Sequence, residues 1–290
     1  CALPILVSVV AGTTTSSTTP SGDGGSALNA VFTTISDVAV NLATGDIYVA
    51  DDSGNRVRKI SGGIITAFAG IGTFGFSGDG GLATAANLNF PTGLAVDSSG
   101  NVFISDRSNQ RIRKVNASDG KISTFAGTGT AVTLNTPNGL SFDVDGNLYV
   151  ADGSVVRMIT PTLTASIVLG STTSNGSFIP PQIGTASDVF VLTRDVYVTD
   201  TRNDQVYYVA ALAGKPGASN SLGASLLAGR SSTVAIGGTA NLAAFNFGST
   251  ITGSMVVAFD GGILHHYAID GSAHSALRHE LRAAAADIGG

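Results

Sequence analysis

The sequence predicts an all-β fold in which a four-stranded antiparallel sheet recurs along the chain, which is the architecture of a β-propeller. Two observations carry this prediction. A strand, an aspartate, a polar turn and a second strand recur at a spacing of roughly 50 residues, beginning with GDIYVADDSGNRVRKI (residues 45–60). The composition agrees, because 38 of the 290 residues are glycine and only 12% are charged. Frequent turns between short Val, Ile, Tyr and Phe runs are typical of β proteins.

Each repeat unit contains four predicted strands. The later copies of the central pair are GNVFISDRSNQRIRKV (100–115), GNLYVADGSVVRMI (146–159), RDVYVTDTRNDQVYYV (194–209) and the degenerate GSMVVAFDGGILHHYAI (253–269). A strand precedes each of the first four pairs (ISDVAV, PTGLAVD, PNGLSFD and ASDVFVL), and another follows it (IITAFAG, KISTFAG, TASIVLG and LLAG). The Asp, Asn and Gly residues between these strands suit tight hairpin turns, so each unit predicts one blade.

Five blades are predicted over residues 1–271, with a sixth as the alternative. Ile5 to Gly12 (ILVSVVAG) has the pattern of a fourth strand, and we expect it to close the ring by pairing beside the third strand near Ile263 to Ile269. Residues 272–290 are expected to form a separate tail or linker. A short helix is predicted from about His274 to Asp287, where Ala, Leu, Arg and Glu are dense.

The pentapeptide SGDGG occurs twice, at residues 21–25 and 77–81. Neither copy is followed by the Lys-Ser/Thr of a phosphate-binding loop. Both copies are expected to lie where the chain crosses from the outermost strand of one blade to the innermost strand of the next, in conformations that glycine accepts without strain. Asp23 and Asp79, at the centres of the two copies, are expected to cap backbone N–H groups there.

The segment Phe68 to Val115 resembles NHL-repeat propellers, whose blades carry AGTG, GDGG, P-x-G-L-A-V-D, G-N-x-Y-I-A-D and N-x-R-I-R-K-V motifs. The resemblance is strong over residues 26–129 and extends to residue 209; the last unit has no clear P-x-G-L-A-V strand. The resemblance implies a propeller, more often of six blades. Its relatives include RNA-binding proteins and a metal-using lyase, whose histidine-bearing blades have no counterpart here.

One aspartate and one arginine recur at the same position of successive units. We expect the aspartates to accept hydrogen bonds from the turn after the second strand, and the arginines of the third strand to form ion pairs or cover neighbouring strands. A ring of carboxylates around a cation is the alternative for the aspartates. The residues are Asp51, Asp106, Asp152 and Asp200, with Arg58, Arg113 and Arg157.

No metal, cofactor or catalytic site is predicted. The four histidines lie close together in sequence, but His274 and His279 are not at the i, i+4 spacing of helical zinc ligands. His265 and His266 are adjacent and therefore point to opposite faces of a strand. Residues 143–147 (DVDGN) resemble the start of a calcium loop, yet the glycine comes too early, so a hairpin turn is predicted. No nucleophile motif is present.

Several features bear on location and partners. The sequons at Asn116 and Asn175 lie in predicted loops and permit glycans in an extracellular setting. The net charge of -5 disfavours nucleic acid as a partner, and no apolar run is long enough to span a bilayer. The single cysteine, Cys1, is open to three interpretations: a disulfide to another segment, a lipidated first residue, or only the start of this sequence.

These features predict a non-catalytic propeller that serves as a rigid protein–protein interaction or structural module of an extracellular or cell-surface protein. Its expected partners are other protein subunits or domains. A propeller that binds carbohydrate or small ligands is one alternative; it predicts exposed aromatic residues on the loop face, and only Phe74 and Phe76 lie in such a loop. A hydrolase or lyase predicts a channel lined with His, Asp and Glu, and RNA binding requires a basic face.

Overall fold

The computed structural model describes residues 8–13, 18–170 and 183–209, together with strands at 224–229, 255–260 and 263–268. These residues contain four four-stranded antiparallel sheets, or blades, whose strands follow chain order. Blade 1 comprises β1 (Ile35–Val40), β2 (Ile47–Asp51), β3 (Arg56–Ser61) and β4 (Ile64–Ala69). Blade 2 comprises β5 (Pro91–Val96), β6 (Val102–Asp106), β7 (Arg111–Val115) and β8 (Ile122–Gly127). Blade 3 comprises β9 (Pro137–Phe142), β10 (Leu148–Asp152), β11 (Val155–Ile159) and β12 (Ala165–Gly170). Blade 4 comprises β13 (Ala186–Leu192), β14 (Asp195–Asp200), β15 (Gln205–Val209) and β16 (Ala224–Gly229).

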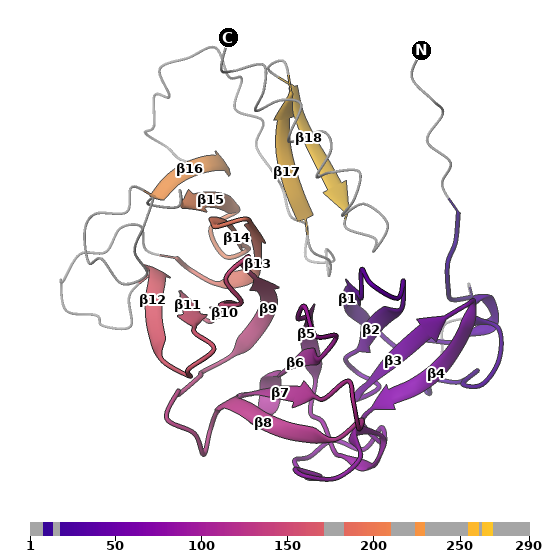
Figure 1. Cartoon of the computed structure of the whole chain (residues 1–290). Coiled ribbons are helices and arrows are strands. Elements are labelled where there is room, and N and C mark those ends of the chain that lie inside the picture. The colour runs from indigo at the N-terminus through magenta and orange to yellow at the C-terminus, as the bar shows by residue number, and fades with distance from the viewer. Residues whose placement is uncertain are drawn as a thin grey trace.

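The blades are arranged radially, as the sequence predicts for a propeller. The first strands of neighbouring blades lie side by side near the centre, β1 against β5, β5 against β9 and β9 against β13 (Figure 1). Three 3-10 turns lie in the connections, η1 (Ala27–Asn29), η2 (Ala83–Ala85) and η3 (Arg107–Asn109). No helix in the described parts of the chain is long and apolar enough to cross a membrane.

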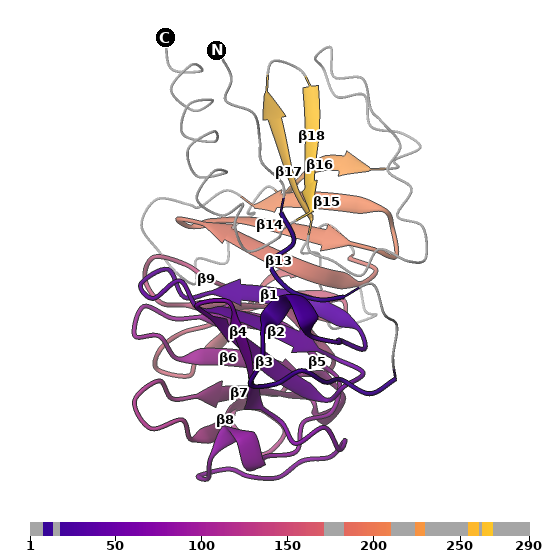
Figure 2. The ribbon, with the colours of Figure 1, turned by 90° about the vertical axis from the view of Figure 1, so that its right-hand side faces the viewer.

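The prediction of five or six four-stranded blades is wrong for the described residues. The fifth unit contributes a two-stranded sheet of β17 (Met255–Asp260) and β18 (Ile263–Ala268), which lies next along the arc after blade 4 (Figures 1 and 2). These two strands correspond to the central strand pair, residues 253–269, which is the part of the fifth unit that resembles the repeat. The sequence before this pair has no apolar P-x-G-L-A-V motif that would predict a further strand.

The predicted closing strand is also wrong in its described part. Residues 8–12 form no strand, and β18 pairs with β17 alone among the described strands. The N–H groups of Gly12 and Thr13 instead donate to the carbonyls of Ala27 and Ala30 at 2.9 and 3.0 Å, which directs this segment against η1. The predicted helix at 274–287, the boundary at residue 271 and Cys1 lie outside the described residues.

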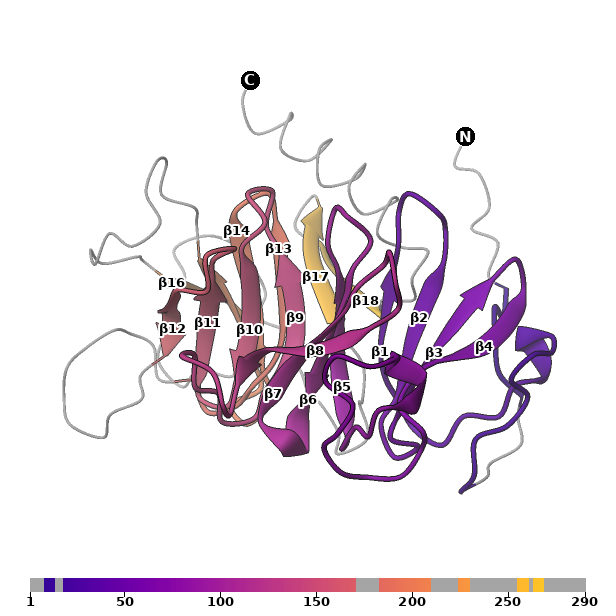
Figure 3. The same cartoon turned by 60° about the horizontal axis from the view of Figure 1, so that its bottom comes forward.

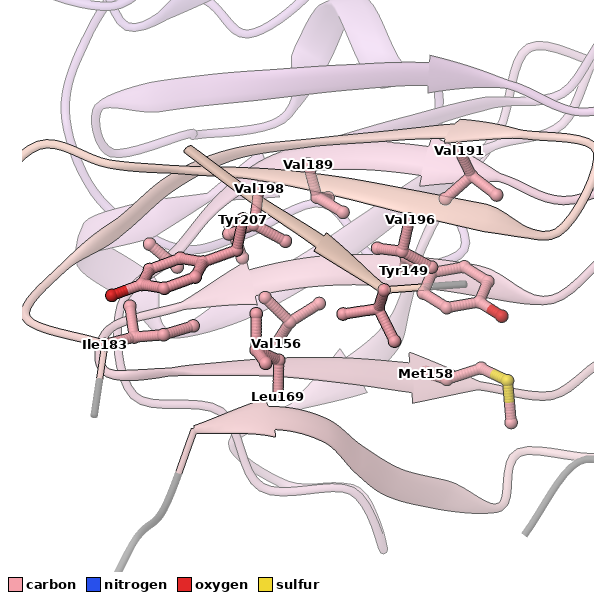
Figure 4. Packing of buried hydrophobic residues seen from close by; sticks show 13 residues of the cluster. Tyr149, Val156, Met158, Leu169, Ile183, Val189, Val191, Val196, Val198 and Tyr207 are labelled. Carbon is pink, nitrogen blue, oxygen red and sulfur yellow. The ribbon is translucent and has the colours of Figure 1, made fainter. Parts of the chain in front are cut away.

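The hydrophobic core lies between neighbouring blades. In β6, all five residues are buried, because Val102 and Ile104 pack toward blade 1 while Phe103 packs toward blade 3. Strands covered on both faces lack the polar alternation of half-exposed strands. Figure 4 shows the cluster between blades 3 and 4, where Tyr149 and Met158 face Val189, Val196 and their neighbours.

Three buried or partly buried tyrosines predict a loss of stability at alkaline pH. Burial, reinforced by nearby carboxylates, raises the pKa of Tyr149, Tyr197 and Tyr207 to about 12 from the ordinary value of 10.0. A pKa that is higher in the folded than in the unfolded chain stabilises the fold below pH 10, and this contribution is lost as the pH rises toward 12. We expect phenolate absorbance to appear together with unfolding in this range. Free ionisation near pH 10, with the fold intact, would contradict the burial of these phenols.

Glycine ends the outermost strand of blades 1, 2 and 3 for a steric reason. Gly70, Gly127 and Gly170 have φ values of 86°, 108° and 87°, in the left-handed region that favours glycine. A Cβ at each would lie 2.4, 2.1 and 2.2 Å from a carbonyl oxygen just before the third strand of the same blade. The recurring glycine therefore lets the chain turn out of the blade at close range.

The SGDGG copy at residues 77–81 lies in the crossing from blade 1 to blade 2, as predicted, whereas the copy at residues 21–25 precedes blade 1 with no described strand before it; each copy also covers a sheet edge. In blade 1, Gly24 N–H donates to Ile65 O at 2.7 Å and Ile65 N–H donates to Gly25 O at 3.0 Å. In blade 2, Gly80 and Gly81 make the same two bonds with Ile122, at 2.8 and 2.9 Å. Each segment thus runs antiparallel to the outermost strand of the blade that it leads into.

Candidate functional site

The four blade aspartates connect two loops on the same end of each blade. Each lies opposite the first residue of the innermost strand, in the pairs Ile35–Asp51, Pro91–Asp106, Pro137–Asp152 and Ala186–Asp200. All four are buried, and each accepts backbone N–H bonds from the residues just before that strand. The donors are Thr33 and Thr34, Asn89, Asn135 and Thr136, and Gly184 and Thr185, at 2.7 to 3.1 Å.

The predicted bond to the following turn is therefore only part of the role of these aspartates. Asp106 accepts from the Asn109 side chain at 2.8 Å, and Asp200 accepts from the Asn203 side chain at 2.8 Å. The bonds that recur in all four blades instead reach backward by 15 to 18 residues. Sequence reasoning missed them because the donors are backbone groups, which leave no residue signature. Burial raises the pKa of Asp106, and the Asn109, Asn89 and Arg113 donors act against that rise.

Two buried arginines bind the SGDGG crossings. Arg58 donates to Asp23 at 2.9 Å and Arg113 donates to Asp79 at 2.6 Å, and both guanidinium groups also bind loop carbonyls. The predicted ion pairing of the arginines is confirmed. The prediction that Asp23 and Asp79 cap backbone N–H groups is wrong, since their described partners are side chains. Leaving a buried guanidinium unpaired costs free energy, so Arg58 and Arg113 form ion pairs with the carboxylates of Asp23 and Asp79.

Arg157 differs from the other two arginines because blade 3 has no SGDGG crossing. Its side chain is 18% exposed, and it donates to the blade aspartate Asp152 at 2.8 Å. Arg113, in contrast, is fully buried between Asp79 and Asp106. The SGDGG segments of blades 1 and 2 therefore supply a second carboxylate that the third-strand arginine of blade 3 lacks.

The crossing from blade 1 to blade 2, residues 70–90, carries the exposed aromatic residues of the loop face. We call it the Phe74–Phe76 loop. The side chains of Phe74 and Phe76 are 71% and 44% exposed. The guanidinium of Arg111 lies 3.8 Å from the centre of the Phe76 ring. Ile71 and Phe90 add further exposed apolar surface to the same loop.

Hydrogen bonds hold the Phe74–Phe76 loop in place at several points. Asn109 of η3 donates to Gly75 O at 2.7 Å, and Asn87 donates to Thr73 O at 2.9 Å. Gly75 N–H donates to Leu88 O at 3.2 Å, next to a parallel bridge between Phe74 and Leu88. The exposed rings are thus presented on a loop with a defined backbone.

The other sequence candidates lie apart from this loop. Asp143 accepts from Asp145 N–H, Asn147 N–H and the Asn147 side chain at 2.8 to 2.9 Å, which confirms the predicted hairpin turn. Asn116 is exposed in the β7–β8 turn, and its Oδ1 accepts from Ser118; Asn175 lies outside the described residues. The backbone of His265 and His266 is in β18, whereas His274 and His279 lie outside the described part. No group of three or more His, Cys, Asp and Glu side chains within the described ranges could hold a metal ion.

Comparison with known proteins agrees with this architecture. A family model described as the NHL repeat matches residues 88–115, which contain β5, β6 and β7 of blade 2. The chain therefore contains an NHL repeat at residues 88–115. The matched segment contains Asp106, Asn109 and Arg113, so the aspartate–arginine arrangement described above falls within the repeat.

Several solved structures resemble parts of this chain. The virginiamycin B lyase from Staphylococcus aureus is 12% identical with a TM-score of 0.48, and the match covers 81% of this chain and 70% of that one. A streptogramin B lyase is 12% identical with a TM-score of 0.45, covering 61% of this chain and 51% of that one. A putative gluconolactonase is 16% identical with a TM-score of 0.47, covering 63% and 61%. The chain thus spans about half the length of the streptogramin B lyase. No curated protein matches the sequence.

Proposed function

We propose that this NHL-repeat propeller is a non-catalytic interaction module, and that the Phe74–Phe76 loop is its protein-binding surface. The observation that carries the proposal is the exposure of Phe74, whose side chain is 71% exposed on a hydrogen-bonded loop. Aromatic residues and arginine are enriched at the buried centres of protein interfaces. Phe76 beside Arg111 has this composition.

The fixed backbone of the loop favours binding. A partner that docks on Phe74 and Phe76 does not have to order the segment first, because the bonds from Asn87 and Asn109 already do so. Association is weakened by the entropy lost when loops become ordered, so a preorganised loop retains more of the contact energy. The four blades supply the rigid support, since the crossing joins blade 1 to blade 2.

The proposed setting is extracellular or at the cell surface, in an assembly with other protein subunits. It is supported by the exposed sequon at Asn116, which lies in the β7–β8 turn. The segment around Gly75 is bound at the other end of blade 2, by Asn109 of the β6–β7 connection, whereas residues 80–83 of the same loop bond Gly120 and Ile122 at the β7–β8 turn. A glycan on Asn116 would therefore lie away from Phe74 and Phe76, on the side of the loop formed by residues 80–83.

Site-specific crosslinking tests this function. A photo-reactive residue is placed at Phe74 or, as the matched control, at Leu42, which is 67% exposed in the β1–β2 turn at the other end of blade 1. In the native source we expect a saturable protein adduct at position 74 and none at position 42. Excess wild-type chain should compete for the adduct. The Phe74→Ser chain should compete more weakly, because its binding free energy for the partner should be about 2 kcal/mol less favourable, as for a central interface residue.

Two results would contradict the proposed function. Equal labelling at both positions, or equal competition by wild type and Phe74→Ser, would show that the loop is not the contact. Binding of purified chain to a glycan array that depends on Phe74 would favour the carbohydrate-binding alternative, since exposed aromatic rings also stack on sugars. Mass spectrometry of the same native material, before and after glycosidase treatment, shows whether Asn116 carries a glycan.

A further inference from the structure

Among the described residues, none covers the outer edge of the outermost strand of blade 3, whereas the corresponding edges of blades 1 and 2 are covered. The SGDGG crossings pair with β4 and β8 through backbone hydrogen bonds of 2.7 to 3.0 Å. The connection into blade 3, residues 128–136, is much shorter and bonds back on itself, with Thr130 N–H donating to Gly127 O and Gly127 N–H donating to Val132 O. None of the described residues forms a backbone bond with the outer edge of β12.

The strand register identifies the backbone groups that this difference leaves open. Ile65, Ile122 and Ala165 occupy the same place, opposite Ile60, Val115 and Ile159 of the third strands. Ile65 and Ile122 are fully buried, and their N–H and C=O groups bond the crossings. Ala165 is exposed. Because Ala165 has the same register as Ile65 and Ile122, its N–H and C=O groups point away from β11. The N–H and C=O groups of Ile167 point the same way, because backbone groups alternate in direction every two residues along a strand.

The sequence around β12 does nothing to protect this edge. Natural edge strands are usually guarded by charged residues, especially lysine, which prevent pairing with another chain. No charged residue occurs between Arg157 and Asp188, so the whole of β12 and its flanks is neutral.

We infer that β12 pairs antiparallel with β12 of a second copy of this chain, which joins the two blades into one continuous sheet. A strand that pairs antiparallel with itself satisfies both open edges through a single two-fold contact. The crossings in blades 1 and 2 cover their edges in the same antiparallel sense. A neutral strand carries no charge that would repel its own copy or select a different partner.

The location of β12 permits this contact. β12 lies at the rim of the molecule, on the outside of blade 3 (Figures 1 and 3). The pairing is therefore independent of the Phe74–Phe76 loop, which belongs to the crossing between blades 1 and 2. A dimer formed through β12 would present two copies of that loop.

Measurement of mass by light scattering across a wide concentration range tests the inference on the full chain. Ala165→Pro removes only the outward N–H, a change that edge strands tolerate, and Ile167→Lys places a charge on the edge. Val144→Lys, in the exposed β9–β10 turn, is the charge control. We expect wild type and Val144→Lys to dimerise, and both edge variants to dimerise at least about tenfold more weakly with unchanged melting temperatures.

Each other outcome overturns the inference. A wild-type chain that remains monomeric at high concentration would show that the β12 edge does not pair with a second copy, for example because another part of the same chain covers it. A dimer that persists in both edge variants would place the contact elsewhere. If Ala165→Pro alone fails to fold, Ile167→Lys still decides the result, because it leaves every backbone N–H in place.

Discussion

Replacing Arg113 by methionine is expected to lower the free energy of unfolding by about 3 to 5 kcal/mol, the cost of breaking a buried ion pair from one side. The Arg113 guanidinium has no exposed surface and binds four acceptors, which are Asp79, Asp106 and the carbonyls of Ser77 and Asn87. Methionine keeps most of the side-chain volume, so the decrease in the free energy of unfolding comes from the missing charge and hydrogen-bond donors and not from a cavity. Chemical denaturation of the purified chain measures it.

The same substitution in blade 3 is the matched control. Arg157→Met removes an arginine from the same repeat position, but the Arg157 side chain is 18% exposed, and the buried Asp152 keeps its hydrogen bonds from Asn135 N–H and Thr136 N–H. We expect a loss of about 1 kcal/mol, typical of one hydrogen-bonded contact. Equal losses for Arg113→Met and Arg157→Met would contradict the importance of the SGDGG crossing for the buried arginine.

The pH dependence of the Arg113→Met variant provides a second check. Burial already raises the pKa of Asp106, and Arg113 acts against that rise, so the variant should raise this pKa further. An acid whose pKa is higher in the folded chain contributes stability at low pH, and this contribution is lost as the pH rises through the folded pKa. The deficit of the variant should therefore shrink as the pH falls toward the ordinary aspartate value of 3.8.

Gly93→Ala is expected to destabilise the propeller by about 3 kcal/mol, at the upper end of the cost of inserting a methyl group into a packed core. Gly93 lies in β5, and a Cβ there would be 2.0 Å from the backbone oxygen of Asn138 in β9. Backbone cannot move aside as a flexible side chain can, so the innermost strands of blades 2 and 3 must separate.

Gly81→Ala is the control for this change. Its Cβ would lie 3.4 Å from the nearest atom, which is ordinary contact, and its φ is outside the left-handed region. We expect a change within about 0.5 kcal/mol, as for most tolerated surface substitutions. Denaturation curves that leave Gly93→Ala as stable as Gly81→Ala would show that β5 and β9 do not approach this closely.

Local pattern was enough to predict the blades of this protein. Two-residue alternation and Asp, Asn and Gly turns located the strands of blades 1 to 4, because strand direction and hairpin geometry depend on neighbouring residues. The repeat spacing then predicted a radial arrangement. The exposure of Phe74 and Phe76 also agrees with their position in a predicted crossing.

The partners of the polar residues and the state of the sheet edges depended on the tertiary structure. Asp51 binds Thr33 and Arg58 binds Asp23 only because strand pairing and the path of the crossing bring together groups 18 and 35 residues apart. The fourth-strand pattern at Ile5 to Gly12 did not make a strand of its described part, since the Gly12 N–H is bound by Ala27. Within the described residues the outer edge of β12 is uncovered, because the connection into blade 3 is shorter than the segments that carry SGDGG and bonds back on itself. Alternation specifies a strand, but long-range backbone hydrogen bonding decides what lies beside it.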